Sequence, residues 1–445
     1  MAVMMQAFYW DSPKHEKKEH EWWNFVAEKV EDLGKAGINA LWLPPVNKAA
    51  STTSMGYDPY DYFDLGDFEQ KGGKKTWFGN RAELETLIAK AHLHGMGLYA
   101  DIVIDHCSGA DEQEVNPMDG QKHWTKFNPK SGIFPRDYNH FYPSRYERVV
   151  IEGENYEGYP NLCHRNPDVY AAMYRYTRML IEELGFDGFR FDYAKGFGAW
   201  MIGLLAKYLY KKDGKDFVPY VVGEYWSGTG DIDGWLDRVE ALTNNQVAAF
   251  DFPLRYKLKD VCDTMHYDLR NLTDGGAVVM KRPRHAATFV DNHDMGSNMI
   301  VNDKLMAYSF IMVHEGYPCI FWYDYYNNGL ARPGTPNGID ALLLAHHGHA
   351  GGDSQILHAD PDLYIMQRVG WKDQSANQPG LIYVLNNLGN QWSGTSVKTR
   401  WANQKFVPIA WDGHDEAWPD PRTTDSDGNA EFPAPPRGYA IYVPA

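Results

Sequence analysis

The 445-residue sequence is poor in features that would each define a class of protein. It has four cysteines, Cys107, Cys163, Cys262 and Cys319, and no two of them form a Cys-x-x-Cys pair. This spacing argues against a zinc knuckle and a disulfide scaffold, so we expect four reduced thiols. No stretch comes near the roughly 18 consecutive apolar residues that a membrane-spanning helix needs. We therefore expect no membrane partner.

Basic runs are also absent, and the formal net charge is −16. An acidic chain repels a polyanion, which argues against a nucleic-acid partner, and solubility is the simplest explanation of the acidity. The first twenty residues have neither the basic nor the apolar region of a secretory signal. Either the protein stays inside the cell or the chain begins where a removed signal ended. Localisation stays open.

Aromatic residues are plentiful, with 15 Trp and 29 Tyr, many of them beside Gly, Asp or His. The C–H faces of a sugar ring bury well against such side chains, so a carbohydrate ligand would suit this composition. Composition alone also fits a second explanation, in which these side chains fill a large core.

Short apolar runs alternate with helical patterns along most of the chain. Strands are expected at 3–10, 38–45, 97–105, 186–192, 217–224, 247–253, 286–292 and 317–322. Helices are expected at 22–36, 80–95, 197–212, 231–243, 255–272, 303–314 and 338–350. Eight strands that alternate with helices are typical of a closed (β/α)₈ (TIM) barrel in the α/β class.

Two regions break this alternation. Residues 107–165 are rich in Gly, Pro, Asn and Tyr without a helical period, and they are too long for a structureless loop, so they predict a small domain inserted after strand three. From 352 onward the pattern is that of strands and turns, which predicts a C-terminal antiparallel β-sandwich. The predicted domains are 1–106 and 166–351 for the barrel, 107–165 for the insert (domain B) and 352–445 for the β domain (domain C).

The stretch "GFDGFRFDYAKG" (185–196) places charges in an otherwise apolar strand. Alternation along the strand puts Arg190 and Asp192 on the same side. Such a pair is either a buried structural ion pair or part of an active site, and the stretch alone does not decide between them. Asp101, in strand three, is a candidate partner of Arg190. Asp187 lies on the far face and is interpreted as structural.

The reacting groups of barrel enzymes lie at the carboxyl ends of the strands, and this chain has acidic and imidazole groups there. Asp192 and Glu224 follow neighbouring strands, as a retaining glycosidase requires of its nucleophile and its acid/base. We expect Arg190 to keep Asp192 ionised, and the apolar and aromatic neighbours of Glu224 to raise its pKa. The same rim receives His106, His293 and Asp294.

Four short motifs occur in order along the chain: "DIVIDH" (101–106), "GFRFDYAKG" (188–196), "GEYW" (223–226) and "FVDNHD" (289–294). "MGYDPYDYFDLGDF" (55–68) and "GYPNLCHRNPDV" (158–169) accompany them. With these motifs the sequence resembles the α-amylases of the α-glucan-active glycoside hydrolase family, and looks closest to the compact archaeal and plant-like members. The resemblance runs along nearly the whole chain and implies the barrel, the insert and the β domain described above.

The resemblance also implies roles for individual residues. Asp192 matches the nucleophile, Glu224 the general acid/base and Asp294 the third carboxylate, which stabilises the transition state. Other positions match residues that contact the substrate: Arg190, His106 and His293 around the reacting glucose, Tyr57 as an aromatic platform, Lys195 and Gly196 on the leaving-group side, and Trp226 beside the acid/base.

Amylases of this kind usually bind calcium through an Asn in the first motif and an Asp in the "YPD" position. Here Asp105 and Asn161 exchange those two types, which keeps ligand number and charge, and calcium accepts both. We expect Ca²⁺ on Asp105 and Asn161, with Glu152 and the Gly196 carbonyl as further ligands. The alternative is a metal-free, hydrogen-bonded pair. Some relatives add a zinc site, but here only Cys163 matches it and no histidine does, so no zinc is expected.

The best interpretation is a retaining, endo-acting α-amylase that cleaves internal α-1,4 bonds of starch or glycogen, most simply as a monomer. Within the same fold, an exo-acting amylase that releases one maltooligosaccharide, an α-glucosidase or a transglycosylase remains open. A glucan-binding protein without activity would require the loss of a carboxylate, and all three are present. Trp371, Trp392 and Trp401 are candidates for a starch site on the β domain, but packing is the more ordinary explanation for them.

Overall fold

The computed structural model describes residues 2–371 and 378–445, and eight of its strands form a closed parallel barrel. The strand order is β1–β14–β13–β12–β11–β8–β5–β2. The barrel strands are β1 (Met4–Gln6), β2 (Ala40–Leu43), β5 (Gly97–Ile102), β8 (Gly188–Phe191), β11 (Tyr220–Gly223), β12 (Val247–Phe250), β13 (Ala286–Phe289) and β14 (Tyr317–Phe321). Every residue of these strands is buried except the first residue of β5, β11 and β14, which explains why the strands read as apolar runs. The predicted barrel is confirmed.

The helices follow the strands much as expected. They are α1 (Ser12–His15), α2 (Trp22–Ala36), α3 (Arg81–Leu93), α4 (Pro167–Arg178), α5 (Ala199–Lys207), α6 (Thr229–Glu240), α7 (Phe252–Asp263), α8 (Val278–Lys281), α9 (Lys304–Val313) and α10 (Ile339–His349). Single turns lie at Tyr138–His140, Met179–Glu183, Leu269–Leu272, Pro283–His285, Gly296–Asn298 and Tyr323–Asn327. Sequence features explain both the packing and the start of individual helices. The apolar face of α2 is buried, and α3 begins with a capping box between Asn80 and Glu83.

Two helix predictions were wrong in part, and one helix was missed. The helix expected at 255–272 is α7, which ends at Asp263, followed by a separate turn at Leu269–Leu272. The helix expected at 197–212 ends at Lys207. The chain then turns back at Gly214, which has a positive φ of 74° that glycine adopts readily. A hairpin of β9 (Tyr210–Lys212) and β10 (Lys215–Phe217) takes its place. Helix α4 was not predicted at all. It begins at Pro167, directly after the insert.

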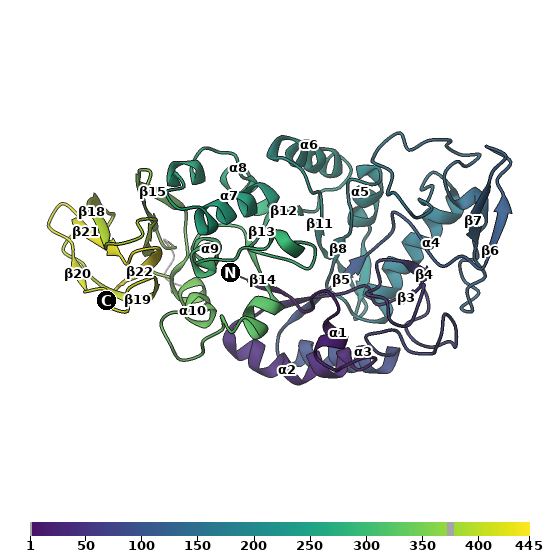
Figure 1. Ribbon diagram of the computed structural model, residues 1–445, viewed down its shortest axis with the longest axis horizontal. Helices are drawn as coiled ribbons and strands as arrows, with labels where there is room; N and C mark the ends of the chain where they lie inside the picture. The colour runs from purple at the N-terminus through teal and green to yellow at the C-terminus, as the bar shows by residue number, and fades with distance from the viewer. Residues whose placement is uncertain (1, 372–377) are drawn as a thin grey trace. The chain divides into compact units, whose positions relative to one another are not determined.

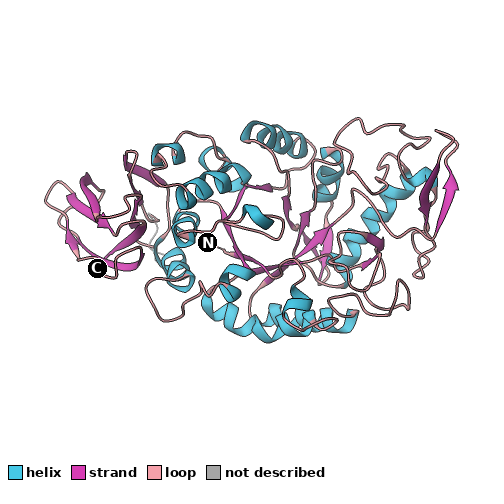
Figure 2. Cartoon of the chain, viewed as in Figure 1, coloured by secondary structure: helices cyan, strands magenta, loops and turns pink. Residues whose placement is uncertain are grey.

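The described residues divide into two compact units. One comprises residues 7–34 and 39–250 and carries, besides the β9–β10 hairpin, four short strands outside the barrel: β3 (Lys48–Ala49), β4 (Pro59–Asp61), β6 (Glu112–Val115) and β7 (Lys122–Lys126). β3 pairs with β4, and β6 pairs with β7, both antiparallel. Figure 2 shows β6 and β7 as an isolated strand pair among the long loops of the insert.

The other unit comprises residues 2–6, 35–38 and 251–445 and ends in an antiparallel β domain. Its strands, yellow in Figure 1, are β15 (Ser354–Ala359), β16 (Leu363–Arg368), β17 (Leu381–Asn386), β18 (Ser393–Lys398), β19 (Lys405–Asp412), β20 (Arg422–Thr423), β21 (Asn429–Ala434) and β22 (Gly438–Pro444). The sheet order β15–β16–β17–β22–β19–β20, with β18–β21 as a separate pair, confirms the predicted β domain. Trp401 packs against its apolar core, whereas Trp371 is half exposed.

All four cysteines are buried and free. Among the helices described, none is both long enough and apolar enough to cross a bilayer. The domain boundaries expected from the sequence stay predictions.

Candidate active site

Arg190 is the centre of a buried charged cluster, and β8 places it there. In the register of the sheet it lies beside Asp101 of β5 on one side and Val222 of β11 on the other. Its Nη1 donates hydrogen bonds to Asp101 Oδ1 (2.8 Å) and Asp192 Oδ1 (2.7 Å), and its Nη2 lies 2.9 Å from Glu224 Oε2. Only 1% of the Arg190 side chain is exposed. One guanidinium therefore contacts three carboxylates.

Burial and mutual attraction shift the pKa values of Arg190 and Asp101 in this cluster. Burial disfavours the charge of Arg190, but attraction to the three carboxylates outweighs it and raises the pKa of Arg190 well above its usual range. Burial raises the pKa of Asp101 to about 7, while Arg190 opposes the rise and Asp192 adds to it. The guanidinium also lies over the ring of Trp42, 4.9 Å from its centroid. The charges in the strand thus belong to a cluster of four groups rather than to a simple ion pair.

Arg190 contacts more carboxylates than the sequence indicated, because Glu224 shares the guanidinium with Asp192 and Asp101. The Glu224 oxygen that Arg190 contacts, Oε2, also accepts a hydrogen bond from the Tyr193 N–H at 3.0 Å. Tyr193 has a φ of 42°, the left-handed backbone that non-glycine residues rarely adopt. This sharp turn directly after Asp192 is what brings the Tyr193 N–H to Glu224. Asp192 and Glu224 keep only 12% and 8% of their side chains exposed.

Tyr57 and His106 lie beside this cluster. The Tyr57 hydroxyl donates to Asp101 Oδ2 (2.8 Å), and the Tyr57 carbonyl contacts His106 Nε2 (2.8 Å). The other ring nitrogen of His106 lies 3.2 Å from Asp105 Oδ2. Burial opposes the charge of His106, but the Asp105 carboxylate outweighs it and raises the pKa of this imidazole. The His106 ring stacks on Tyr156 at 4.3 Å, so both ring nitrogens and one face are engaged by protein groups.

Three of the four predicted calcium ligands converge. Asn161 Nδ2 donates to Asp105 Oδ2 at 2.7 Å, and a Cβ placed on Gly196 would lie only 2.4 Å from Asp105 Oδ1. Burial raises the pKa of Asp105. Glu152 lies at the edge of this group, 3.7 Å from Arg165 and 53% exposed. The described residues hold no cluster of three or more His, Cys, Asp or Glu side chains suited to a metal. The groups that meet here are one carboxylate and one amide, and the amide presents its N–H to the carboxylate, as in the hydrogen-bonded pair expected without a metal. Carboxylate and amide oxygens are both ligands that calcium accepts, so calcium would require the Asn161 amide to turn its oxygen inward.

The remaining predicted residues of this unit lie on the loop after β8 and after β11. Lys195 Nζ pairs with Glu154 Oε2 at 3.0 Å, and the Glu154 N–H donates to the Lys195 carbonyl, so this loop is tied to the insert. Gly196 N–H donates to the Tyr193 carbonyl. Trp226 is partly exposed two residues beyond Glu224. Their roles toward a substrate stay predictions.

His293 and Asp294 belong to the other unit, where they follow β13. His293 Nδ1 lies 2.9 Å from the Gln6 amide of β1, and its Nε2 lies 3.2 Å from Asp294 Oδ2. The His293 side chain is buried, whereas that of Asp294 is 34% exposed. Nearby in the chain, Asp291 is fully buried and pairs with Arg255 (2.7 Å). The buried ion pair of Asp291 with Arg255 therefore anchors the polar motif "FVDNHD".

Sequence reasoning missed some of the residues that hold the site. Trp42 Nε1 donates a hydrogen bond to Asp101 Oδ2 at 2.9 Å. Asp101 therefore accepts hydrogen bonds from Trp42, Tyr57 and Arg190. Asp101 was expected to be a partner of Arg190, and that is confirmed. Strand alternation within "INALWLPP" indicates which side Trp42 faces, but only the pairing of β2 with β5 places it beside Asp101.

Comparisons with known proteins agree with this geometry. A family profile described as "Alpha amylase, catalytic domain" matches residues 17–203, and one described as "Alpha-amylase C-terminal" matches 381–443. An α-amylase of Geobacillus stearothermophilus is 30% identical over 501 residues, covering 100% of this chain and 87% of that protein. A glucan 1,4-alpha-maltohexaosidase of Bacillus sp. (strain 707) is also 30% identical, over 79% of this chain and 76% of the relative. In the crystal structure of the Geobacillus thermoleovorans α-amylase complexed with acarbose, the fold matches with a TM-score of 0.70 at 18% identity, over 100% of this chain and 98% of that one.

A closed parallel barrel with carboxylates at its strand ends and a C-terminal β domain defines a barrel glycoside hydrolase. The chain belongs to the α-amylase family. Enzymes of this family are retaining glycoside hydrolases.

Proposed function

We propose that this enzyme is an endo-acting α-amylase that hydrolyses internal α-1,4 bonds of starch or glycogen. The observation that carries the proposal is the shared guanidinium: Arg190 contacts both Asp192 and Glu224, which follow the neighbouring strands β8 and β11. A retaining mechanism needs two carboxyl groups about 5 Å apart, one to attack and one to transfer a proton, and contact with one guanidinium keeps these two groups close together.

In this mechanism the Asp192 carboxylate attacks the anomeric carbon while Glu224 donates its proton to the departing glycosidic oxygen. Glu224, now ionised, then takes a proton from water, and that water hydrolyses the glycosyl–Asp192 ester with net retention. Asp294 is proposed as the third carboxylate, which stabilises the transition state. The motif resemblance and the 34% exposure of its side chain support that role.

The substrate contacts are proposed in the same way. Tyr57 would stack beneath the reacting glucose, while Arg190, His106 and His293 fix the geometry around it. Lys195, Gly196 and Trp226 would lie on the leaving-group side. Support for this set is the direct linkage of Tyr57, Arg190 and His106 to the carboxylate cluster. We further propose a monomer with an α-glucan as its partner, and neither nucleic acid nor membrane.

We propose that Ca²⁺ binds at Asp105 and Asn161, with the Gly196 carbonyl and Glu152 completing the protein ligands. The proximity of Asp105, Asn161 and Gly196 supports this, and calcium, once the Asn161 amide turned its oxygen toward it, would neutralise the buried carboxylate of Asp105 and tie the insert to the loop after β8. The test is thermal unfolding with and without a chelator. A fall in Tm that calcium, but not magnesium, reverses supports the site, and an unchanged Tm contradicts it.

Product length separates the endo-acting proposal from an exo-acting one, which the maltohexaosidase relative favours. Proton NMR of an early amylose digest should show the α-anomer first, and chromatography should show mixed oligosaccharides. One dominant short product would establish the exo-acting alternative, and a β-anomer would overturn the role of Asp192. Glu224→Gln should abolish hydrolysis but keep glucan binding. A variant that retains a tenth or more of the activity would show that Glu224 is not the acid/base.

A further inference from the structure

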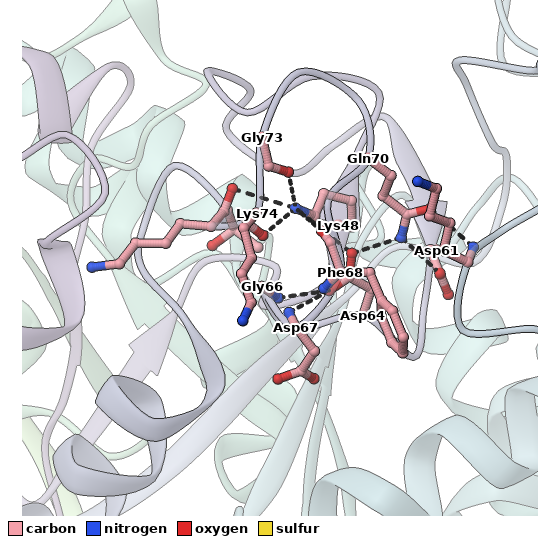
Figure 3. A network of polar contacts seen from close by, with 12 residues as sticks. Lys48, Asp61, Asp64, Gly66, Asp67, Phe68, Gln70, Gly73 and Lys74 are labelled. Atoms are coloured by element: carbon pink, nitrogen blue, oxygen red, sulfur yellow. Dashed lines mark hydrogen bonds and ion pairs between the residues drawn. The ribbon is translucent and has the colours of Figure 1, made fainter.

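Lys48, in β3, places its ammonium group in a cage of backbone carbonyls. Nζ lies 3.0 Å from the carbonyl oxygen of Gly73, 2.5 Å from that of Lys74, 3.4 Å from that of Lys75 and 3.5 Å from that of Phe68. The side chain has no exposed surface. Figure 3 shows the ammonium group surrounded by these carbonyl groups. Four oxygens around one buried cation is the arrangement that proteins otherwise give to a bound metal ion.

The charge that balances Lys48 is Asp64, whose Oδ2 lies 3.6 Å from Nζ and whose side chain is also fully buried. Asp64 is itself saturated with donors: the backbone N–H groups of Gly66, Asp67 and Phe68, and the Gln70 side-chain amide. The Asp64 carboxylate binds N–H groups within 64–70, and the Lys48 ammonium binds carbonyl groups within 68–75. The two charges together therefore order the whole segment 64–75.

The same network reaches the inserted segment. The Gln70 amide also donates to Asp61 Oδ2 at 3.0 Å, and Gln70 Oε1 accepts from the Lys130 N–H at 3.0 Å. Asp61 in turn accepts from the Ser131 hydroxyl at 2.7 Å and from its N–H at 3.1 Å. Order in 64–75 is thus transmitted to residues 130–131 of the insert.

The network also lies at the base of the hairpin that carries Tyr57. β3 and β4 pair with Lys48 opposite Asp61, and residues 50–58 form the loop between them. Tyr57 belongs to this loop, where its hydroxyl donates to Asp101 and its carbonyl contacts His106. We propose that Lys48 is a positioning residue: its ammonium acts as a built-in cation that fixes the 64–75 segment and, through the β3–β4 hairpin, the position of Tyr57. The part that concerns Tyr57 rests on the proposed function.

A tethered ammonium has a physical advantage over a bound ion in this place. It is present at every salt concentration, because the chain itself supplies it. Burial lowers the pKa of Lys48, and the Asp64 carboxylate opposes that shift. Without the ammonium, the carbonyls of 68–75 would face one another with no cation between them, and the segment would have to open to water.

The first test is chemical rescue of Lys48→Ala. Propylammonium replaces the atoms that the substitution removes, so it should refill the cage when present during refolding. We expect kcat/KM on a soluble maltooligosaccharide to fall about 10- to 100-fold, the range produced by displacing a substrate-positioning group by about 1 Å, and propylammonium to restore it. Lys74→Ala is the matched control, since it removes the same charge from an exposed side chain of the same segment. Equal activities for the two variants would overturn the proposal.

Hydrogen exchange at the amides of 64–75 separates the structural part of the proposal from the catalytic part. Lys48→Ala should lose protection there, and propylammonium should restore it, whatever the substrate of the enzyme. If Lys48→Ala does not fold, Lys48→Met, which keeps the buried stem, takes its place and is compared with the wild type by the same exchange. Unchanged protection of 64–75 in the variant contradicts the role of the cation.

A double-mutant cycle with Tyr57→Ala tests the link to the active site. If Lys48 acts through Tyr57, its substitution should lower kcat/KM much less in the Tyr57→Ala background than in the wild type. Additive effects would show that Lys48 does not act through Tyr57. If Tyr57→Ala alone leaves kcat/KM unchanged, the assigned role of Tyr57 fails, while the exchange and rescue results still decide whether the cation orders the segment.

Discussion

Asp101→Asn should be the most damaging isosteric substitution outside the reacting carboxylates. Three donors point at this fully buried carboxylate: Trp42 Nε1 (2.9 Å), the Tyr57 hydroxyl (2.8 Å) and Arg190 Nη1 (2.8 Å). An amide of the same size has a single acceptor oxygen, and its NH₂ group would face one of those donors. At pH 8, above the pKa of about 7 to which burial raises Asp101, the carboxylate is ionised and pairs with Arg190.

Removing one partner of a buried ion pair lowers the free energy of unfolding by about 3–5 kcal/mol. We expect the low end, about 3 kcal/mol, because Arg190 keeps its contacts with Asp192 and Glu224. Tyr57 loses its anchor at the same time, so kcat/KM should fall at least tenfold. Urea unfolding and steady-state kinetics at pH 8 measure the two effects.

The matched control is Asp187→Asn on the far face of β8. That carboxylate pairs with His92 and Lys212, but its side chain is 23% exposed, so solvent screens both pairs. We expect the substitution to lower the free energy of unfolding by about 1 kcal/mol and to leave catalysis unchanged. An Asp101→Asn variant that loses no more stability than this control, or that keeps full kcat/KM, would refute the role assigned to Asp101.

Two further substitutions test the surroundings of the proposed calcium site. Burial lowers the pKa of His164 to about 4, so below the ordinary value near 6.5 the unfolded chain binds a proton that the folded chain does not, and stability falls as the pH falls from 6.5 toward 4. Between pH 7 and 5 the wild type should therefore lose about 2 kcal/mol more than His164→Gln in urea unfolding; parallel losses would contradict this. Gly196→Ala should lower stability by about 1–3 kcal/mol, because its Cβ would lie 2.4 Å from Asp105 Oδ1. Gly228→Ala, whose Cβ would meet nothing within 4 Å, is the control, and equal Tm values for the two variants would show that the loop relaxes freely.

The barrel was predictable because its strands are buried on both faces and separated by amphipathic helices, so periodicity carries the information. The C-terminal sheet was predictable for a related reason, since "LYIMQRV" and "GLIYVLNN" are apolar runs bounded by turns. The prediction failed where local chemistry competed with periodicity. Asp213–Gly214 turns the chain directly after the apparent helical pattern of 197–212, so its last residues pair as a strand. Helix α4 begins at a proline within the motif "HRNPDV", for which no helix was expected.

The site was predictable only in part for a different reason. Alternation along one strand puts Arg190 and Asp192 on the same side, but which groups face them from β5 and β11 depends on sheet register. The register sets Asp101 and Val222 beside Arg190 and so lets Glu224 reach it. Lys48 gave no local signal at all, since its partners are backbone carbonyls some 20–27 residues away.

The shared guanidinium changes the explanation of how two similar carboxyl groups acquire opposite roles. Arg190 contacts both Asp192 and Glu224, so its charge cannot by itself distinguish the nucleophile from the acid. The difference lies in the hydrogen bonds around it. Glu224 Oε2 accepts from the Tyr193 N–H and lies 2.9 Å from the cationic Arg190 Nη2, which favours Oε1 as the site of the proton of a neutral Glu224. In the proposed mechanism that oxygen is therefore the one that donates to the leaving group. A lysine at position 190 could supply the charge but not the planar fork that reaches Asp101, Asp192 and Glu224 together, so the geometry of the cluster requires arginine.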